Sequence, residues 1–141
     1  MIKIDIQEMK VNAEPEMLAK ITKGIQDGLM ALALMGQGHA QKSILKGPKS
    51  GAIYKRGKIT HQASAPGEAP ANDTGFLAAN IKAEMTEALT ASIISQAPYS
   101  VHLEYGTRHM EPRPFLRPAG EAIKEQAKGI MDAYVQAASR K

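Results

Sequence analysis

The sequence predicts an α+β fold. We expect a small antiparallel sheet, a long N-terminal helix and a C-terminal helix packed on one face of that sheet, and an extended basic loop or hairpin. Apolar residues alternate with polar ones near the start of the chain and again in its second half, which is typical of strands. In two long segments they recur at three- and four-residue steps, which is typical of amphipathic helices. This order of elements favours helices packed on a sheet, and 141 residues favour one domain, residues 1–141.

The chain begins with a predicted strand and a predicted long helix. Ile2, Ile4 and Ile6 alternate with polar residues, as in a short strand. Pro15 suits the first position of a helix, where its missing N–H costs little. The apolar stripe expected on this helix consists of Leu18, Ile21, Ile25, Leu29 and Leu32.

Two glycine pairs interrupt this helical pattern. Gly24 and Gly28 either allow another element to approach closely or only weaken the helix, by roughly 1 kcal/mol each relative to Ala. Gly36 and Gly38 form a second weak point, at which we expect the helix to bend or end.

A basic segment rich in Gly and Pro follows. Gly47–Gly51 is a break in regular structure. Ala52–Tyr54 and Lys58–His61 flank a Lys-Arg-Gly tip and predict an exposed hairpin. Ser64–Asn72 contains two prolines and a glycine, which exclude regular structure. We expect residues 41–72 to be mobile in the free protein.

The second half predicts a hairpin and a closing helix. Asp73 or Thr74 can cap a short helical turn that begins at Gly75. Ile81–Met85 and Leu89–Ile93 alternate around a turn near Glu87, which predicts a hairpin with one buried face. The apolar stripe expected on the last helix consists of Phe115, Ala119, Ile123, Ile130 and Tyr134.

Between these elements lies Tyr99–Pro118, which we call the elbow. Gly106 is expected to end a short helix or strand, and Pro112 and Pro114 to hold their preceding residues extended. Pro114 or Pro118 is expected to open the final helix. Glu104 is a candidate partner for an arginine, within one subunit or across a boundary. The elbow residues expected in a subunit or partner interface are Tyr99, Glu104, Tyr105, Arg108, Arg113, Phe115 and Arg117.

Charge and composition narrow the function classes. The net charge is +4, and there is no Cys, which excludes disulfides, thiolate metal sites and Cys nucleophiles. No acidic residue lies between Gly28 and Gly67, so the positive charge is local. The block is either a solvated loop or a surface that contacts a neighbouring subunit or the DNA backbone. Its candidate contact residues are Lys46, Lys49, Lys55, Arg56 and Lys58. The first residues lack a signal-peptide pattern and the longest apolar run has seven residues, so we expect a soluble intracellular protein with no membrane contact.

Four motifs within Tyr54–Ala122 carry a resemblance. They are the APGEAP loop, the TGFL turn, the corner from Tyr99 to Thr107 (YSVHLEYGT) and the RPFLRPA helix start. In this order and spacing the chain resembles the small tail-component family of long-tailed bacteriophages, typified by the gene-ten product of a lambdoid phage. The resemblance implies a structural protein of the virion neck or tail end, assembled in the bacterial host cytoplasm. It implies a ring that completes the tail or joins it to the head, other neck and tail proteins as partners, and no cofactor. A monomer in free solution is compatible with it.

Two other function classes stay open. A basic loop can bind the DNA backbone without sequence specificity. His102, Glu104 and His109 suggest a metal or acid–base site, but nothing supplies a nucleophile, a phosphate cradle or a cofactor loop. We therefore expect no catalytic site, and we expect Glu104→Gln to leave the fold intact.

Overall fold

The computed structural model of the protein describes residues 2–5, 14–72 and 74–140. Its element order is β1 (Ile2–Asp5), α1 (Pro15–Lys46), β2 (Ile53–Arg56), β3 (Ile59–Gln62), α2 (Phe76–Ala79), β4 (Ile81–Glu87), β5 (Thr90–Ser95), α3 (Ser100–Tyr105) and α4 (Leu116–Ser139). The predicted α+β class, the long N-terminal helix and the C-terminal helix are confirmed. Ile6 and Asp73, to which predictions were attached, lie outside the described residues.

The main sheet has three antiparallel strands in the order β1-β5-β4. Ile2 pairs with Ile93, and Ile81 pairs with Ser95 at the open end of the β4–β5 hairpin. The pairing shifts between Met85 and Glu87, next to the turn. β2 and β3 form a separate two-stranded sheet.

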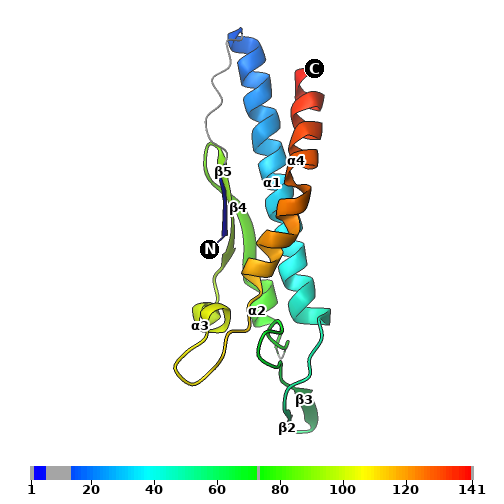
Figure 1. Ribbon diagram of the computed structural model, residues 1–141, viewed down its shortest axis with the longest axis vertical. Helices are drawn as coiled ribbons and strands as arrows, with labels where there is room; N and C mark the ends of the chain where they lie inside the picture. Colours follow the sequence, from blue (N-terminus) through cyan, green and yellow to red (C-terminus); the bar gives the residue numbers. More distant parts are fainter. Residues whose placement is uncertain (1, 6–13, 73, 141) are drawn as a thin grey trace.

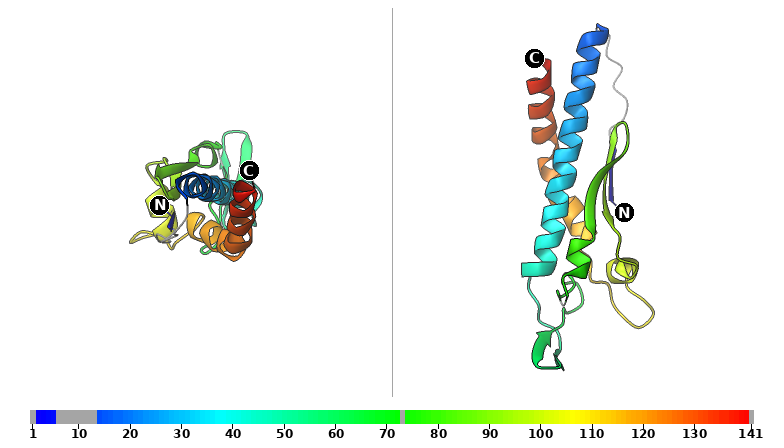
Figure 2. Two further views of the ribbon diagram at one scale, coloured as in Figure 1. Left: turned by 90° about the horizontal axis from the view of Figure 1, so that it is seen from above. Right: turned by 180° about the vertical axis from the view of Figure 1, so that it is seen from behind.

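The helices and the sheet form an elongated body (Figure 1). Seen from above, α1 lies between the sheet and the C-terminal half of α4 (Figure 2). The first half of α4 reaches the sheet, because the side chains of Ile123 and Ile93 both meet the space beside Gly36. Both helices thus lie on one side of the sheet, as predicted, but α4 is in direct reach of it over only part of its length.

Glycine in α1 serves close packing. A Cβ on Gly24 would lie 3.0 Å from the carbonyl oxygen of Tyr134, so only Gly lets α4 approach there. A Cβ on Gly36 would overlap the side chain of Ile93, which is fully buried. The helix neither ends at Gly36 nor at Gly38 but continues to Lys46, because tertiary packing outweighs the weak helix propensity of Gly.

The core lies where α1, α4 and the main sheet meet. Leu29, Leu32, Ile44, Ile93 and Phe115 are at most 1% exposed. Leu18 belongs to the predicted stripe of α1 but is 43% exposed, because the first turns of α1 extend past the sheet (Figure 1).

Two predictions about the middle of the chain are corrected. Residues 41–46 are helical, and Ile44 is buried in the core, so the segment outside regular helix begins at Gly47. The prediction of one buried face is wrong for β5, because Thr90 and Ser92 are buried as well. β5 is the central strand, and the Ser92 hydroxyl lies 3.2 Å from that of Thr86 on the neighbouring strand.

Candidate functional site

Close backbone contacts hold the elbow after the end of α3. Gly106 ends α3 with φ +79°, and a Cβ there would lie 2.8 Å from the carbonyl oxygen of Met110. Thr107 donates its N–H to that same oxygen at 2.7 Å, and Arg113 donates its N–H to Leu103 at 2.7 Å. These contacts fix the direction in which the chain leaves α3. Neither Pro114 nor Pro118 opens α4, which begins at Leu116 and has Pro118 within its first turn.

Glu104 caps the N-terminus of α4. Its Oε2 accepts the N–H groups of Phe115 and Leu116 at 2.8 and 2.9 Å, and its Oε1 accepts that of Arg117 at 2.8 Å. The first N–H groups of a helix lack partners within the helix, and a carboxylate there is also favoured by the helix dipole. Glu104 is only 7% exposed. Among the described residues it pairs with backbone amides, and the expectation of an arginine partner within the chain is wrong.

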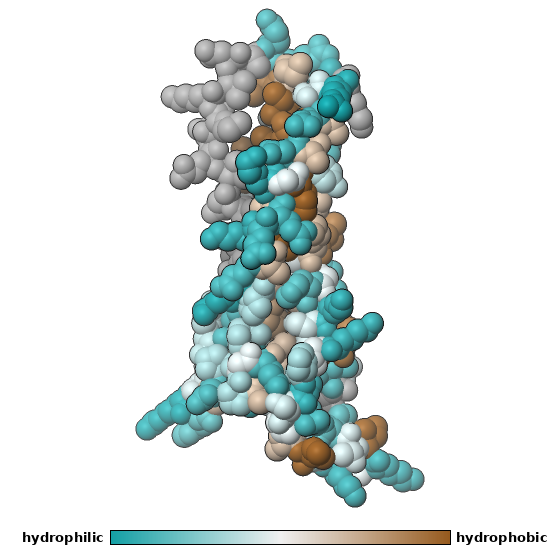
Figure 3. Space-filling model, turned by 45° about the vertical axis from the view of Figure 1, so that its right-hand side comes forward, coloured by the Kyte–Doolittle hydropathy of each residue, from teal (hydrophilic) through white to brown (hydrophobic). Residues whose placement is uncertain are grey.

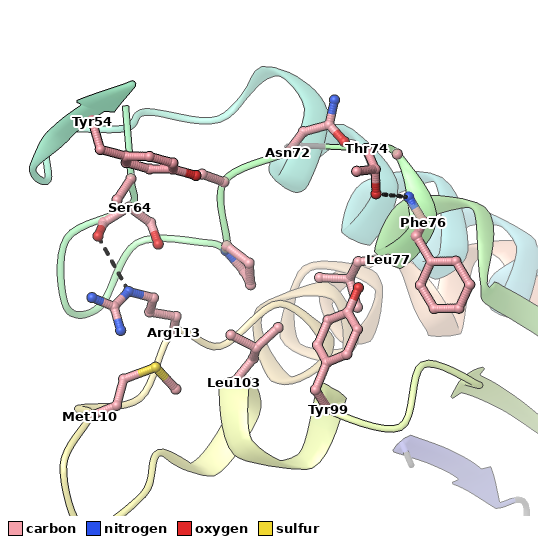
Figure 4. Close-up of a pocket in the computed structure, with 14 residues that line it drawn as sticks. Tyr54, Ser64, Asn72, Thr74, Phe76, Leu77, Tyr99, Leu103, Met110 and Arg113 are labelled. Atoms are coloured by element: carbon pink, nitrogen blue, oxygen red, sulfur yellow. Dashed lines mark hydrogen bonds between the residues drawn. The ribbon is translucent and has the colours of Figure 1, made fainter. Parts of the chain in front are cut away.

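The loop that precedes α2 is joined to the elbow. Gly67 donates its N–H to the carbonyl oxygen of Pro112 at 3.0 Å. Arg113 Nε donates to the carbonyl oxygen of Ser64 at 3.3 Å, and Ser64 is buried (Figure 4). Arg113 thus connects two segments about fifty residues apart.

Glu68 closes the base of the β2–β3 hairpin. Its carboxylate accepts the N–H of Ala65 at 2.9 Å, and both the hydroxyl and the N–H of Ser50. These hydrogen bonds, the backbone bond from Ala65 first, lower the pKa of Glu68. Nearby, burial lowers the pKa of Lys49, which the Glu68 carboxylate opposes. Lys49 Nζ donates to the carbonyl oxygen of Ser43 at 2.9 Å, near the end of α1.

Sequence reasoning did not find these roles of Ser50, Ser64 and Glu68. One signal was present: Glu68 is the only acidic residue between Asp27 and Asp73, in a segment otherwise rich in lysine. A lone carboxylate after a Pro-Gly turn is a candidate for accepting the free N–H groups of that turn.

A groove of about 420 Å³ lies where the hairpin, α2 and α3 meet. Its side chains come from segments far apart in the sequence (Figure 4). The Phe76 and Tyr99 rings lie 6.2 Å apart at its rim. Among the residues that line it are Tyr54, Leu77, Leu103, Met110 and Arg113. Its lining is mainly apolar, and among the described residues that line it there is no His, Asp or Glu to serve as a general acid or base.

The predicted hairpin is present, with shifted bounds. Lys55 and Arg56 lie within β2, and the turn is formed by Gly57 and Lys58. Gly57 has φ +65°, as tight hairpin turns require. Seven of the eight strand residues are exposed, and the hairpin extends from the lower end of the body (Figure 1).

The structure divides the predicted interface residues into two groups. Tyr99, Tyr105, Arg108 and Arg117 are exposed, and Arg113 is partly buried. The guanidinium carbon of Arg117 lies 5.9 Å from the centre of the Tyr105 ring. Glu104 and Phe115 are buried within the chain, at 7% and 1% exposure. Their assignment to an interface is therefore corrected: both hold the elbow and α4 together.

The predicted contact residues of the basic loop also differ in position and exposure. Lys46 ends α1, Lys49 is partly buried at the hairpin base, and Lys55, Arg56 and Lys58 are exposed on the hairpin. Only these last three form the projecting basic surface that the sequence predicted.

The apparent metal cluster does not assemble. His102 and Glu104 are two residues apart on the helix α3, where their side chains diverge. His102 is exposed while Glu104 is buried and engaged as a cap. Over residues 2–5, 14–72 and 74–140, no group of three His, Cys, Asp or Glu side chains could hold a metal ion.

The geometry describes an α+β protein with a projecting basic hairpin and an elbow fixed beside it. Comparison of the chain with protein-family models, curated proteins and solved structures gives no match. None of the helices in the described part of the chain is long and apolar enough to cross a membrane.

Proposed function

We propose that the chain is a structural protein of the neck or tail end of a long-tailed phage or prophage. In this proposal it forms a ring that completes the tail or joins it to the head, and it contacts other neck and tail proteins. The virion is its final location, after assembly in the bacterial cytoplasm.

The observation that supports this proposal is the meeting of the four motifs. Gly67 of the APGEAP loop bonds to Pro112, the residue before the RPFLRPA start, and Arg113 of that start bonds to Ser64, the residue before the APGEAP loop. Glu104 of the corner caps the helix that RPFLRPA begins, and Phe76 of the TGFL turn lies beside Tyr99. Segments spread over more than fifty residues thus build one compact unit. That the residues of the resemblance also form a physical unit favours a common fold as their origin over chance.

The surface chemistry supports assembly over catalysis. The groove in this unit is lined mainly by apolar and aromatic side chains, among them the exposed Tyr54 and Tyr99, together with the partly buried Arg113. Tyr and Arg are the residue types enriched where proteins bind each other. Contact with DNA is a second candidate, because Lys55 and Lys58 are exposed on a hairpin that projects from the body.

Complementation of a phage or prophage that lacks this gene tests the proposal. The count is of joined particles against separate heads and tails in electron micrographs. We expect the null to leave particles unjoined and the intact gene to restore them. Arg113→Ala should impair joining more than Lys58→Ala, because Arg113 holds two motif segments together while Lys58 lies at a turn. Circular dichroism of both purified variants separates an assembly defect from unfolding. Normal infectious particles formed with no copy of the protein would exclude the proposed role.

A further inference from the structure

The β2–β3 hairpin exposes apolar side chains in the part of the chain that the structure describes. Ile53 and Ile59 are 69% and 61% exposed. Ile59 pairs with Arg56 and Ile53 with Gln62, so the two isoleucines lie on opposite faces. In a two-stranded sheet each strand also has one unpaired edge. Phosphate contacts do not account for apolar side chains exposed on both faces, whereas a protein partner does.

A second unpaired edge lies on β4. The order β1-β5-β4 makes β4 an edge strand of the main sheet. Ala83 donates its N–H to the Gln37 side chain at 2.8 Å, and therefore its amide faces away from β5. Alternate residues of a strand point the same way, so the backbone groups of Ile81 and Met85 also face outward. Met85, Thr86 and Glu87 are exposed, and among the described strands only β5 pairs with β4.

Helix α1 runs beside that edge and exposes an apolar side chain there. It is tied to β4 at two points, by Gln37 to Ala83 and by Gln26 to the carbonyl oxygen of Ala88. Eleven helical residues and five strand residues both span about 16 Å, so the two elements run side by side between these ties. Leu34 lies within this interval, one helical turn before Gln37, and is 50% exposed. A strand added next to β4 would cover it.

The charges of the two surfaces are complementary. The exposed charges of β4 are Lys82, Glu84 and Glu87, which sum to −1. The hairpin carries three cations, Lys55, Arg56 and Lys58. Hydrophobic and hydrophilic residues lie next to each other at the lower end of the molecule, where the hairpin lies (Figure 3).

We propose that the hairpin of one copy pairs, as an added strand, with the β4 edge of a second copy. The isoleucine on the face that turns towards α1 then covers Leu34, cations of the hairpin meet Glu84 and Glu87, and a backbone group replaces Gln37 on the Ala83 amide. Strand addition obtains affinity from backbone hydrogen bonds and specificity from alternate side chains.

The two surfaces lie at different places on the body, so the contact is head-to-tail (Figure 1). Such a contact makes rings when the rotation closes and filaments when it does not. That the contact closes into a ring rests on the proposed function. The contact itself is argued only from the surfaces of the hairpin and of the β4 edge.

Single cysteines test the contact, since the natural chain has none. Lys55→Cys and Glu84→Cys proteins are mixed at high concentration and treated with a short bismaleimide. We expect a cross-linked dimer at a yield about tenfold above that of Lys55→Cys mixed with Lys124→Cys, a control on exposed α4 surface. The Lys55→Cys, Glu84→Cys double variant should give a ladder of oligomers. Equal yields in the two mixtures would overturn the proposal.

Charge reversal provides a second readout. Lys55→Glu should weaken self-association about tenfold, and mixing it with Glu84→Lys should restore the contact. If Lys55→Glu instead abolishes binding to a labelled DNA duplex and leaves self-association unchanged, the hairpin binds DNA and the proposal fails.

The role in the virion and the contact between hairpin and β4 can be refuted separately. Particles that require this protein but show no cross-link between positions 55 and 84 would keep the virion role and exclude this contact. A specific cross-link in solution, with normal particles from the null, would keep the contact and exclude the virion role.

Discussion

The cap that Glu104 places on α4 gives the most direct test of the structure. Glu104→Ala removes the acceptor of three N–H groups, those of Phe115, Leu116 and Arg117. Phe115 and Leu116 are 1% and 5% exposed, so water cannot readily replace the carboxylate there. Arg117 is exposed, and its N–H can be hydrated.

The expected loss of stability follows from the burial of Phe115 and Leu116. A buried donor left without a partner costs about 1–3 kcal/mol, and there are two such donors. Loss of a negative charge at the helix N-terminus adds about 0.3–1 kcal/mol. These contributions span about 2–7 kcal/mol. We expect Glu104→Ala to lower the free energy of unfolding by about 3–5 kcal/mol, near the middle of that range and a large part of the stability of an ordinary domain. Glu104→Gln retains one oxygen acceptor and should lose about 1–2 kcal/mol. This replaces the expectation that Glu104→Gln leaves the fold unaffected.

Urea unfolding followed by far-UV circular dichroism measures both variants, with the midpoint and the m-value fitted together. Glu111→Ala is the matched control, because this carboxylate lies in the same elbow but is exposed, and it should stay within about 0.5 kcal/mol of the natural protein. A loss below about 1 kcal/mol for Glu104→Ala, with an unchanged m-value, would refute the capping role.

Three further predictions concern positions that the structure constrains closely. Gly36→Ala should destabilise by about 1–3 kcal/mol in the same unfolding assay, because the new methyl group overlaps the fully buried Ile93 side chain. Gly106→Ala should cost about 1–3 kcal/mol, since the residue has φ +79° and a Cβ there would lie 2.8 Å from the Met110 carbonyl oxygen. The hydrogen bonds of Glu68 lower its pKa, so their contribution is complete above the ordinary glutamate pKa and is lost as the pH falls through the lower folded value. Acid should therefore open the hairpin base, and Glu68→Gln should remove this pH dependence.

Control variants are available for the two glycines, and a direct readout is available for Glu68. Gly38→Ala and Gly129→Ala add a methyl group where nothing lies within 4 Å, and each should be neutral or stabilising by up to about 1 kcal/mol. For Glu68, amide hydrogen exchange of Ser50 and Ala65 reports the opening directly. Equal effects of Ala at positions 36 and 38, no loss in Gly106→Ala, or acid opening that persists in Glu68→Gln would each contradict the corresponding argument.

The sequence predicted the elements that depend on local patterns. The α1 stripe apart from Leu18, the β4–β5 hairpin, the exposed basic hairpin and the start of α1 at Pro15 all follow from periodicity and from Gly and Pro. The sequence-based predictions were wrong where burial in the core determines the local structure. The predicted mobile loop includes residues 41–46 because the segment 41–72 is rich in Gly, Pro and Lys, yet Ile44 packs into the core and the helix continues to Lys46. In the sequence the glycines of α1 appeared to weaken the helix. In the structure Gly24, Gly28 and Gly36 are the places where side chains and backbone of α4 and β5 pack closely against α1.

What the sequence determined by itself is the fold class, the local elements and the place of the positive charge, because these depend on residues close together in the chain. Only the tertiary structure decided the partners of Glu104, Arg113 and Glu68. Each reaches a group between three and 49 residues away, and most of those groups are backbone amides or carbonyls that every residue carries. A side chain's choice among identical backbone groups cannot be determined until the chain has folded. For this reason Glu104, which appears in the sequence as a surface carboxylate beside arginines, is in the structure the buried cap of the last helix.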